Sequence, residues 1–130
     1  MESQDMCRVL VIDDEKLMRE TLRPIFSGLG AQVVAEAENG DDGIRAFQEH
    51  RPDATFLDIK MPGKSGVETL KDIIEIDPDA VVVMLTAVTD SNIADSCIEH
   101  GARHFIRKGA SPAILSIMLK AGLDMVNPAA

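Results

Sequence analysis

The sequence is poor in aromatic residues, because its 130 residues include four phenylalanines but no tyrosine and no tryptophan. Such a chain has few rings on which bases can stack, and it has no basic stripe. The formal net charge of -9 would also repel a phosphate backbone. We therefore expect no direct contact with nucleic acid.

Long apolar runs are absent as well. No run approaches the roughly 18 residues that a membrane-spanning helix needs, and the first residues lack the basic and then apolar pattern of a secretory signal. We therefore expect a cytoplasmic protein with no membrane contact. The two cysteines, Cys7 and Cys97, have no metal-ligand spacing and are expected to be small buried hydrophobic residues.

What the sequence does contain is a regular alternation of short apolar runs with segments of helical periodicity. The runs that predict strands lie at residues 8–12, 31–37, 54–58, 80–85 and 104–107. Strands that alternate with helices favour right-handed βαβ units, and hence a parallel sheet covered on both faces. The predicted fold class is α/β, a doubly wound five-stranded parallel sheet with five helices. We expect one domain at residues 6–125, between flexible tails at 1–5 and 126–130.

Helix starts are marked by capping signals. Ser65 and Glu68 have the spacing of a capping box. Ser111 followed by Pro112 predicts the start of the last helix, and Thr89 or Asp90 can cap the helix before it.

Asp58 ends the central apolar run, just before a Pro62-Gly63 turn. The run predicts a buried strand, so Asp58 should lie at the carboxyl edge of the sheet, where ligands bind in open α/β folds. Asp58 is therefore placed for chemistry. The alternative, which this stretch alone leaves open, is that Asp58 only caps or bends the following turn.

Polar residues also follow three other predicted strands. Asp13 and Asp14 follow the first strand, Thr86 the fourth and Lys108 the fifth. Three carboxylates drawn together stay ionised only around a cation, and their oxygens suit Mg²⁺. With Mg²⁺ and the Lys108 ammonium, such a pocket favours phosphoryl transfer to Asp58, and Thr86 could donate a hydrogen bond to a phosphoryl oxygen. Each residue alone has an ordinary structural explanation, but the combination predicts an aspartyl-phosphate site.

With these residues in place, the chain resembles the receiver domain of bacterial two-component response regulators, of the chemotaxis-regulator type, from about Met6 to Leu123. The resemblance implies a flavodoxin-like sheet of order 2-1-3-4-5. It implies that Asp13 and Asp14 serve Mg²⁺, with Asp14 a direct ligand. Asp58 would be phosphoacceptor and ligand, and Lys60 would contribute its backbone carbonyl.

The resemblance also assigns roles to three residues around the acceptor. Thr86 corresponds to the switch hydroxyl, Phe105 to the aromatic residue whose rotamer follows it, and Lys108 to the lysine that pairs with the phosphate. One departure is Gly109, where the family usually has proline after this lysine. A cis bond without proline costs about 2.5–4 kcal/mol, so we expect a trans peptide there.

A second departure concerns Lys60 and Val88, which flank the acceptor at positions that tune dephosphorylation in the family. Neither side chain would help an attacking water, so we expect a long-lived phosphorylated form. The last helix is more apolar than one core-facing stripe requires, and we expect a partner to cover the excess.

The expected function is a phosphorylation-dependent switch and not an enzyme. A histidine kinase or histidine phosphotransfer protein would donate the phosphoryl group to Asp58. A downstream protein or a second copy would then meet the fourth helix, last strand and last helix. No effector domain is evident, so we expect a stand-alone protein.

Three alternatives remain open. The chain could be the receiver fragment of a longer transcriptional regulator, or a receiver-like interaction module that phosphorylation does not regulate. A phosphatase of the haloacid dehalogenase type also uses an aspartate nucleophile with Mg²⁺. Its chemistry needs an Asp-x-Asp pattern after the first strand, where this chain has Asp13, Asp14 and Glu15.

Overall fold

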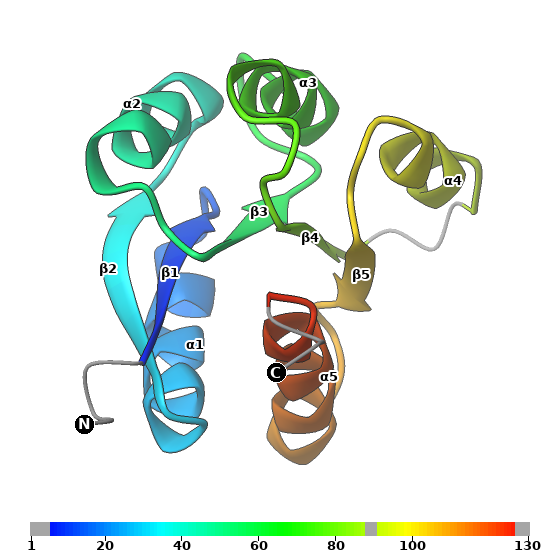
Figure 1. Cartoon of the computed structure of the whole chain (residues 1–130). Helices are drawn as coiled ribbons and strands as arrows, with labels where there is room; N and C mark the ends of the chain where they lie inside the picture. The colour runs from blue at the N-terminus through cyan, green and yellow to red at the C-terminus, as the bar shows by residue number, and fades with distance from the viewer. Residues whose placement is uncertain (1–5, 88–90, 127–130) are drawn as a thin grey trace.

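Strands and helices alternate along the chain, as the sequence predicts (Figure 1). The computed structural model describes residues 6–87 and 91–126. The elements are β1 (Cys7–Ile12), α1 (Lys16–Gly28), β2 (Ala31–Ala37), α2 (Gly40–His50), β3 (Ala54–Asp58), α3 (Gly66–Ile76), β4 (Val82–Thr86), α4 (Ser91–Glu99), β5 (His104–Arg107) and α5 (Pro112–Asp124).

The five strands form one parallel sheet in the order β2-β1-β3-β4-β5, which confirms the expected fold and strand order. Helices α2, α3 and α4 cover one face of the sheet, and α1 and α5 cover the other (Figure 1). Because every strand runs in the same direction, all five carboxyl ends lie at one edge. That edge carries the polar residues singled out above.

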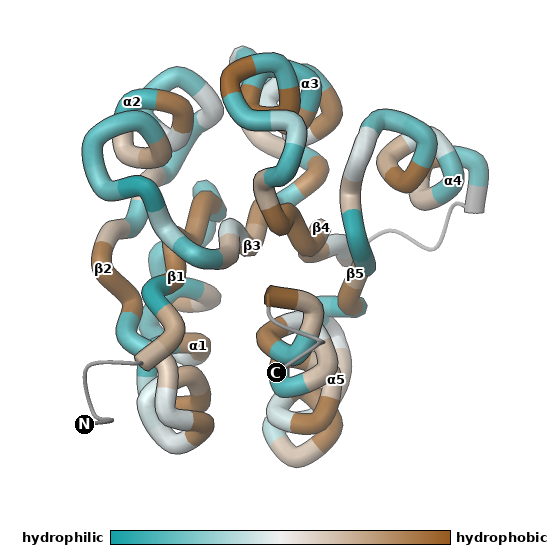
Figure 2. The backbone as a smooth tube through the Cα atoms, viewed as in Figure 1, coloured by the Kyte–Doolittle hydropathy of each residue, from teal (hydrophilic) through white to brown (hydrophobic). Residues whose placement is uncertain are grey.

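Each face of the sheet has its own buried cluster, because successive side chains of a strand point to opposite faces. On β1, Leu10 and Ile12 belong to the cluster beneath α2, α3 and α4, and Val9 and Val11 to the cluster beneath α1 and α5. Figure 2 shows the corresponding apolar character of the central strands. Apolar packing on both faces therefore fixes the strands that hold the site.

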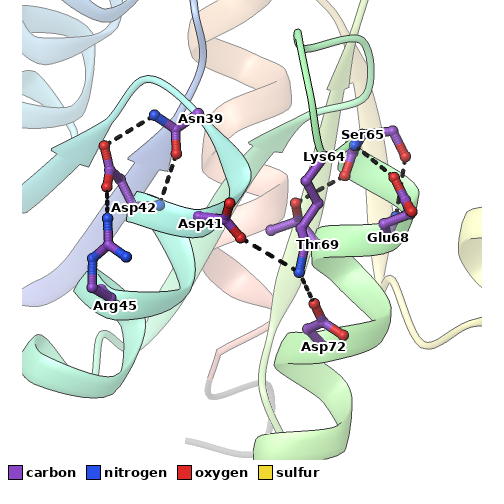
Figure 3. A network of polar contacts seen from close by, with 9 residues as sticks. All are labelled: Asn39, Asp41, Asp42, Arg45, Lys64, Ser65, Glu68, Thr69 and Asp72. Carbon is purple, nitrogen blue, oxygen red and sulfur yellow. Dashed lines mark hydrogen bonds and ion pairs between the residues drawn. The ribbon is translucent and has the colours of Figure 1, made fainter.

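Polar contacts fix the starts of α2 and α3 (Figure 3). The Ser65 hydroxyl accepts a hydrogen bond from the Glu68 N–H at 3.3 Å, and the Glu68 carboxylate accepts one from the Ser65 N–H at 3.0 Å. This is the predicted capping box. Lys64, in the loop after β3, forms ion pairs with Asp41 of α2 and Asp72 of α3.

Several smaller expectations can be compared with the structure. Ser111 caps α5, where its hydroxyl accepts a hydrogen bond from Ile114 N–H at 3.4 Å. Cys97 is buried as expected, whereas Cys7 is half-buried. Val126, which we assigned to the C-terminal tail, packs against the cluster beneath α1 and α5.

The proposed caps Thr89 and Asp90, the tail at residues 1–5 and the rest of the C-terminal tail lie outside the described residues. Among the residues that are described, no peptide bond is cis, so the Lys108-Gly109 bond is trans as predicted. None of the described helices has the length and apolar character needed to cross a membrane.

Candidate functional site

The carboxyl edge of the sheet holds a polar hollow of about 220 Å³. Asp58 and Thr86 are the last residues of β3 and β4, and Asp13 and Lys108 directly follow β1 and β5. The hollow is lined by Asp14, Glu15, Asp58, Lys60, Thr86, Ala87 and Lys108. The structure therefore brings together the residues that the sequence placed at four strand ends.

Asp13, Asp14 and Asp58 form a carboxylate cluster in which one oxygen of each lies within 4.8 Å of the others. Asp13 and Asp58 are buried, with 0% and 4% of their surface exposed, whereas Asp14 is exposed. The Asp13 Oδ1 atom accepts a hydrogen bond from the Glu15 N–H at 2.9 Å. Its buried Oδ2 atom forms an ion pair with the Lys108 ammonium at 2.9 Å. Three carboxylates that offer only oxygen ligands at this spacing fit a hard divalent cation such as Mg²⁺.

Lys108 supplies the positive charge of the hollow. Its backbone N–H donates to the Thr86 carbonyl at 2.9 Å, which fixes the residue beside the end of β4. Its Nζ lies 2.9 Å from Asp13 Oδ2 and 3.3 Å from Asp58 Oδ2. Burial would lower the pKa of Lys108, but hydrogen bonds to Glu15 and Asp13 and the charge of Asp58 raise it above its usual value. Lys108 is therefore a permanent cation.

Asp58 has the most perturbed carboxyl group described in the site. Burial and the charge of Asp13 raise the pKa of Asp58 to about 7, although Lys108 opposes the shift. The raised pKa means that the positive charge of Lys108 does not offset the effects of burial and of the Asp13 charge on the Asp58 carboxylate. A bound divalent cation would supply the missing positive charge and keep Asp58 ionised.

Thr86 and Phe105 occupy neighbouring strands but different environments. Thr86 is buried with 2% of its surface exposed, and it lines the hollow. Phe105 lies on β5 opposite Met84 of β4, is 37% exposed, and is not among the residues that line the hollow. Phe105 therefore lies outside the hollow, on the strand that pairs with β4.

Lys60 lines the hollow with an exposed side chain just beyond β3. Its position next to the carboxylate cluster agrees with a backbone contact to a metal ion. Val88, the other flanking residue, lies outside the described residues.

Three further residues shape the site without having been expected from the sequence. Glu15 contacts Lys108, and Arg19 donates a hydrogen bond to the Asp13 carbonyl at 2.6 Å. At Gly66, a Cβ atom would lie 2.1 Å from the carbonyl oxygen of Asp58. Glu15 could have been found from the sequence, because it directly follows the acidic pair Asp13 and Asp14. Arg19 and Gly66 depend on contacts between elements that carry no local sequence pattern.

The comparisons with known proteins agree with this geometry. The family model for the response regulator receiver domain matches residues 9–120. Protein CcdB of Bacillus subtilis is 41% identical over 103 residues, which cover 79% of this chain and 86% of that protein. Chemotaxis protein CheY of the same species is 39% identical over 101 residues, or 78% of this chain and 84% of that protein.

A solved structure is similar as well. The structure of a CheX-CheY-BeF3-Mg complex from Borrelia burgdorferi has a TM-score of 0.84 and 25% identity, over 93% of this chain and 97% of that chain. The fold, the edge that carries the aspartates and the family match lead to one conclusion. The chain belongs to the response regulator receiver domains of two-component signal transduction.

Proposed function

We propose that this receiver domain is a phosphorylation-dependent switch in which Asp58 accepts a phosphoryl group. The observation that carries the proposal is the position of Asp58, buried at the base of the hollow with Lys108 Nζ 3.3 Å from its Oδ2 atom. The donor would be the phosphohistidine of a histidine kinase or of a histidine phosphotransfer protein. The P–N bond breaks, a P–O bond to the Asp58 carboxylate forms, and the imidazole leaves with the electron pair.

The residues of the hollow would have different roles in this transfer. Asp13, Asp14, Asp58 and the Lys60 carbonyl would hold Mg²⁺, which when bound neutralises charge on the carboxylates and the phosphoryl oxygens. Lys108 attracts the phosphoryl group, and Thr86 can donate a hydrogen bond to one of its oxygens. Burial of Asp58 limits the access of water to the product.

The output would be a change in protein contacts. Exposed apolar side chains lie on α4, β5 and α5, at Ile98, Phe105, Ile114 and Ile117. The excess apolar surface that the sequence predicted for the last helix therefore lies on Ile114 and Ile117. Leu119 is fully buried, and Met118 is half-buried against the core. We propose that phosphorylation alters how a downstream protein or a second copy meets this face.

We also propose that the chain acts through a separate partner and has no turnover of its own on another substrate. The similarity to the chemotaxis protein of Bacillus subtilis supports a separate partner, because the matched region covers 84% of that protein. The Borrelia burgdorferi structure, which pairs CheX with a CheY, supports a protein partner. The mass of the native protein would distinguish this proposal from a receiver attached to an effector domain.

The test of the acceptor uses acetyl phosphate and Mg²⁺ with wild type, Asp58→Asn and the control Asp79→Asn, which removes a carboxylate outside the site. Intact-mass spectrometry should show one added phosphoryl group on wild type and on the control, and none on Asp58→Asn. The adduct should be labile in base, as an acyl phosphate is. An equal yield on Asp58→Asn would refute the assignment, and no adduct on wild type would refute the switch.

A further inference from the structure

Glu15 stands at the N-cap of α1, yet its side chain makes no capping hydrogen bond. Ser, Thr, Asp and Asn are preferred at an N-cap because their short side chains reach the backbone of the first turn. The longer Glu15 side chain instead reaches Lys108, and its Oε1 lies 2.5 Å from Nζ. Glu15 thus connects the start of α1 to the loop after β5, 93 residues away.

The Lys108 ammonium is already fully engaged in this arrangement. It donates hydrogen bonds to Glu15 and Asp58 at 2.5 and 3.3 Å, and it forms an ion pair with Asp13 at 2.9 Å. The Lys108 side chain is only 7% exposed, so a further ligand competes with these three carboxylates for the ammonium. A phosphoryl oxygen that binds this ammonium has to displace one of the three carboxylates.

Glu15 is the carboxylate that leaves at the lowest cost. Asp13 is buried and would lose an ion pair without gaining water, and Asp58 is the residue that carries the phosphoryl group. The Glu15 side chain is 62% exposed, so its carboxylate can return to water. Exposed ion pairs also contribute little to stability, typically about 0–1 kcal/mol.

We propose that Glu15 is a built-in competitor for Lys108, which occupies the ammonium in the resting state and gives it up when a phosphoryl group binds at Asp58. The inference rests on the proposed function. Two effects act in the same direction: Glu15 must be displaced, and its negative charge repels the incoming group. Glu15 therefore lowers the affinity of the hollow for a phosphoryl group.

Glu15 has a second role because the residue after Lys108 is a glycine, Gly109. No atom lies within 4 Å of where a Cβ would be at Gly109, so the residue after Lys108 has neither a ring nor a packed side chain to restrain it. The contact with Glu15 supplies an anchor for the Lys108 side chain in the resting state. The Lys108 side chain is thus held by its ion pairs, of which the one with Glu15 is the shortest.

Beryllofluoride with saturating Mg²⁺ is the probe for this inference, because it resembles a phosphoryl group and needs no turnover. Its affinity is measured by thermal shift for wild type, Glu15→Gln and Glu75→Gln, an exposed residue of α3 whose replacement changes the net charge equally. Glu15→Gln should bind about two- to tenfold more tightly than wild type, with Glu75→Gln unchanged. The gain should shrink at high salt, because the contact is exposed.

A third variant separates direct contact from general charge. Glu15→Asp keeps the negative charge, but its side chain is one methylene shorter and its carboxylate lies further from Lys108. It should therefore also bind beryllofluoride more tightly than wild type. An affinity equal to that of wild type would show that only net charge matters and would overturn the competitor role. So would a Glu15→Gln affinity no tighter than that of Glu75→Gln. If wild type binds no beryllofluoride and accepts no phosphoryl group, the proposed function itself fails.

Discussion

Arg19 donates a hydrogen bond from Nη1 to the backbone carbonyl oxygen of Asp13 at 2.6 Å, while its Nε lies 3.2 Å from the Glu36 carboxylate of β2. The Asp13 N–H donates to the Ala37 carbonyl at 2.9 Å, so the peptide groups on both sides of Asp13 are held. The Arg19 side chain is only 14% exposed. The acidic loop is therefore fixed to the neighbouring strand before any ligand binds.

The first prediction is that Arg19→Gln weakens Mg²⁺ binding, by about three- to tenfold, because the Asp13-Asp14 peptide loses a charged hydrogen-bond donor. Calorimetric titration of Mg²⁺ would measure the change. Arg45→Gln is the matched control, since Arg45 is exposed and pairs only locally with Asp42 in the described structure. Equal affinities for the two variants would contradict the positioning role of Arg19.

The second prediction concerns the pH dependence of stability without metal. The pKa of Asp58 is raised to about 7 in the fold, against about 3.9 in an unfolded chain, so the folded state binds more protons in between. This contribution to stability is present below about pH 4 and is lost as the pH rises toward about 7. Above pH 7, Asp58→Asn should be more stable than wild type by about 1 kcal/mol or more.

Urea unfolding in the presence of a chelator, from about pH 4 to about pH 8, would measure this difference. The advantage of Asp58→Asn should shrink at low pH, where the wild-type carboxyl is protonated in both states. It should also shrink when Mg²⁺ is added, because the cation neutralises the cluster of wild type. A difference independent of pH and of Mg²⁺ would rule out the proposed ionisation.

The third prediction compares two glycines. A Cβ at Gly66 would lie 2.1 Å from the Asp58 carbonyl oxygen and 2.6 Å from Ile59 Cα, so Gly66→Ala has to push the helix away from Asp58, the proposed acceptor. We expect a loss of about 1–3 kcal/mol and slower phosphorylation. Gly109 has open space and no left-handed backbone, so Gly109→Ala should be neutral or stabilising by up to about 1 kcal/mol. Thermal unfolding would compare the two variants, and equal losses would contradict the argument.

The fourth prediction separates core from surface on α5. Leu119 is fully buried, and Leu119→Ala should cost about 2–5 kcal/mol of unfolding free energy. Ile117 is 67% exposed, so Ile117→Asp should leave stability within about 0.5 kcal/mol. The same variant should weaken whatever protein contact beryllofluoride induces, measured as self-association by light scattering or as binding to a purified partner. Unchanged binding would place the output surface elsewhere.

The fifth prediction concerns the lifetime of the phosphorylated form. The exposed Lys60 side chain lines the hollow and can approach phosphoryl oxygens, which hinders an attacking water. Lys60→Asn should therefore speed the loss of phosphate severalfold, and Val88→Glu, which adds a group able to orient water, should speed it further. The decay of the phosphorylated protein after removal of acetyl phosphate gives the rate. Identical decay rates in wild type and both variants would show that neither Lys60 nor Val88 affects the lifetime of the phosphorylated form.

The sequence alone determined the alternation of strands and helices, because the signals involved are local. The alternation of apolar runs and helical periodicity from β1 to α5 depends on residues a few positions apart, and so do the caps at Ser65 and Ser111. The position of Asp58 at a strand end also followed from its own neighbours. Since parallel strands present their carboxyl ends at one edge, the hollow could be predicted from those strand ends.

The tertiary structure decided which atoms meet inside that hollow. No spacing in the sequence links Glu15 to Lys108, Arg19 to the Asp13 carbonyl, or Gly66 to the back of Asp58. Each contact joins different elements, so it depends on how helices pack on the sheet and not on local preference. The charge that surrounds Asp58, and with it a pKa near 7, is for the same reason a property of the folded chain only.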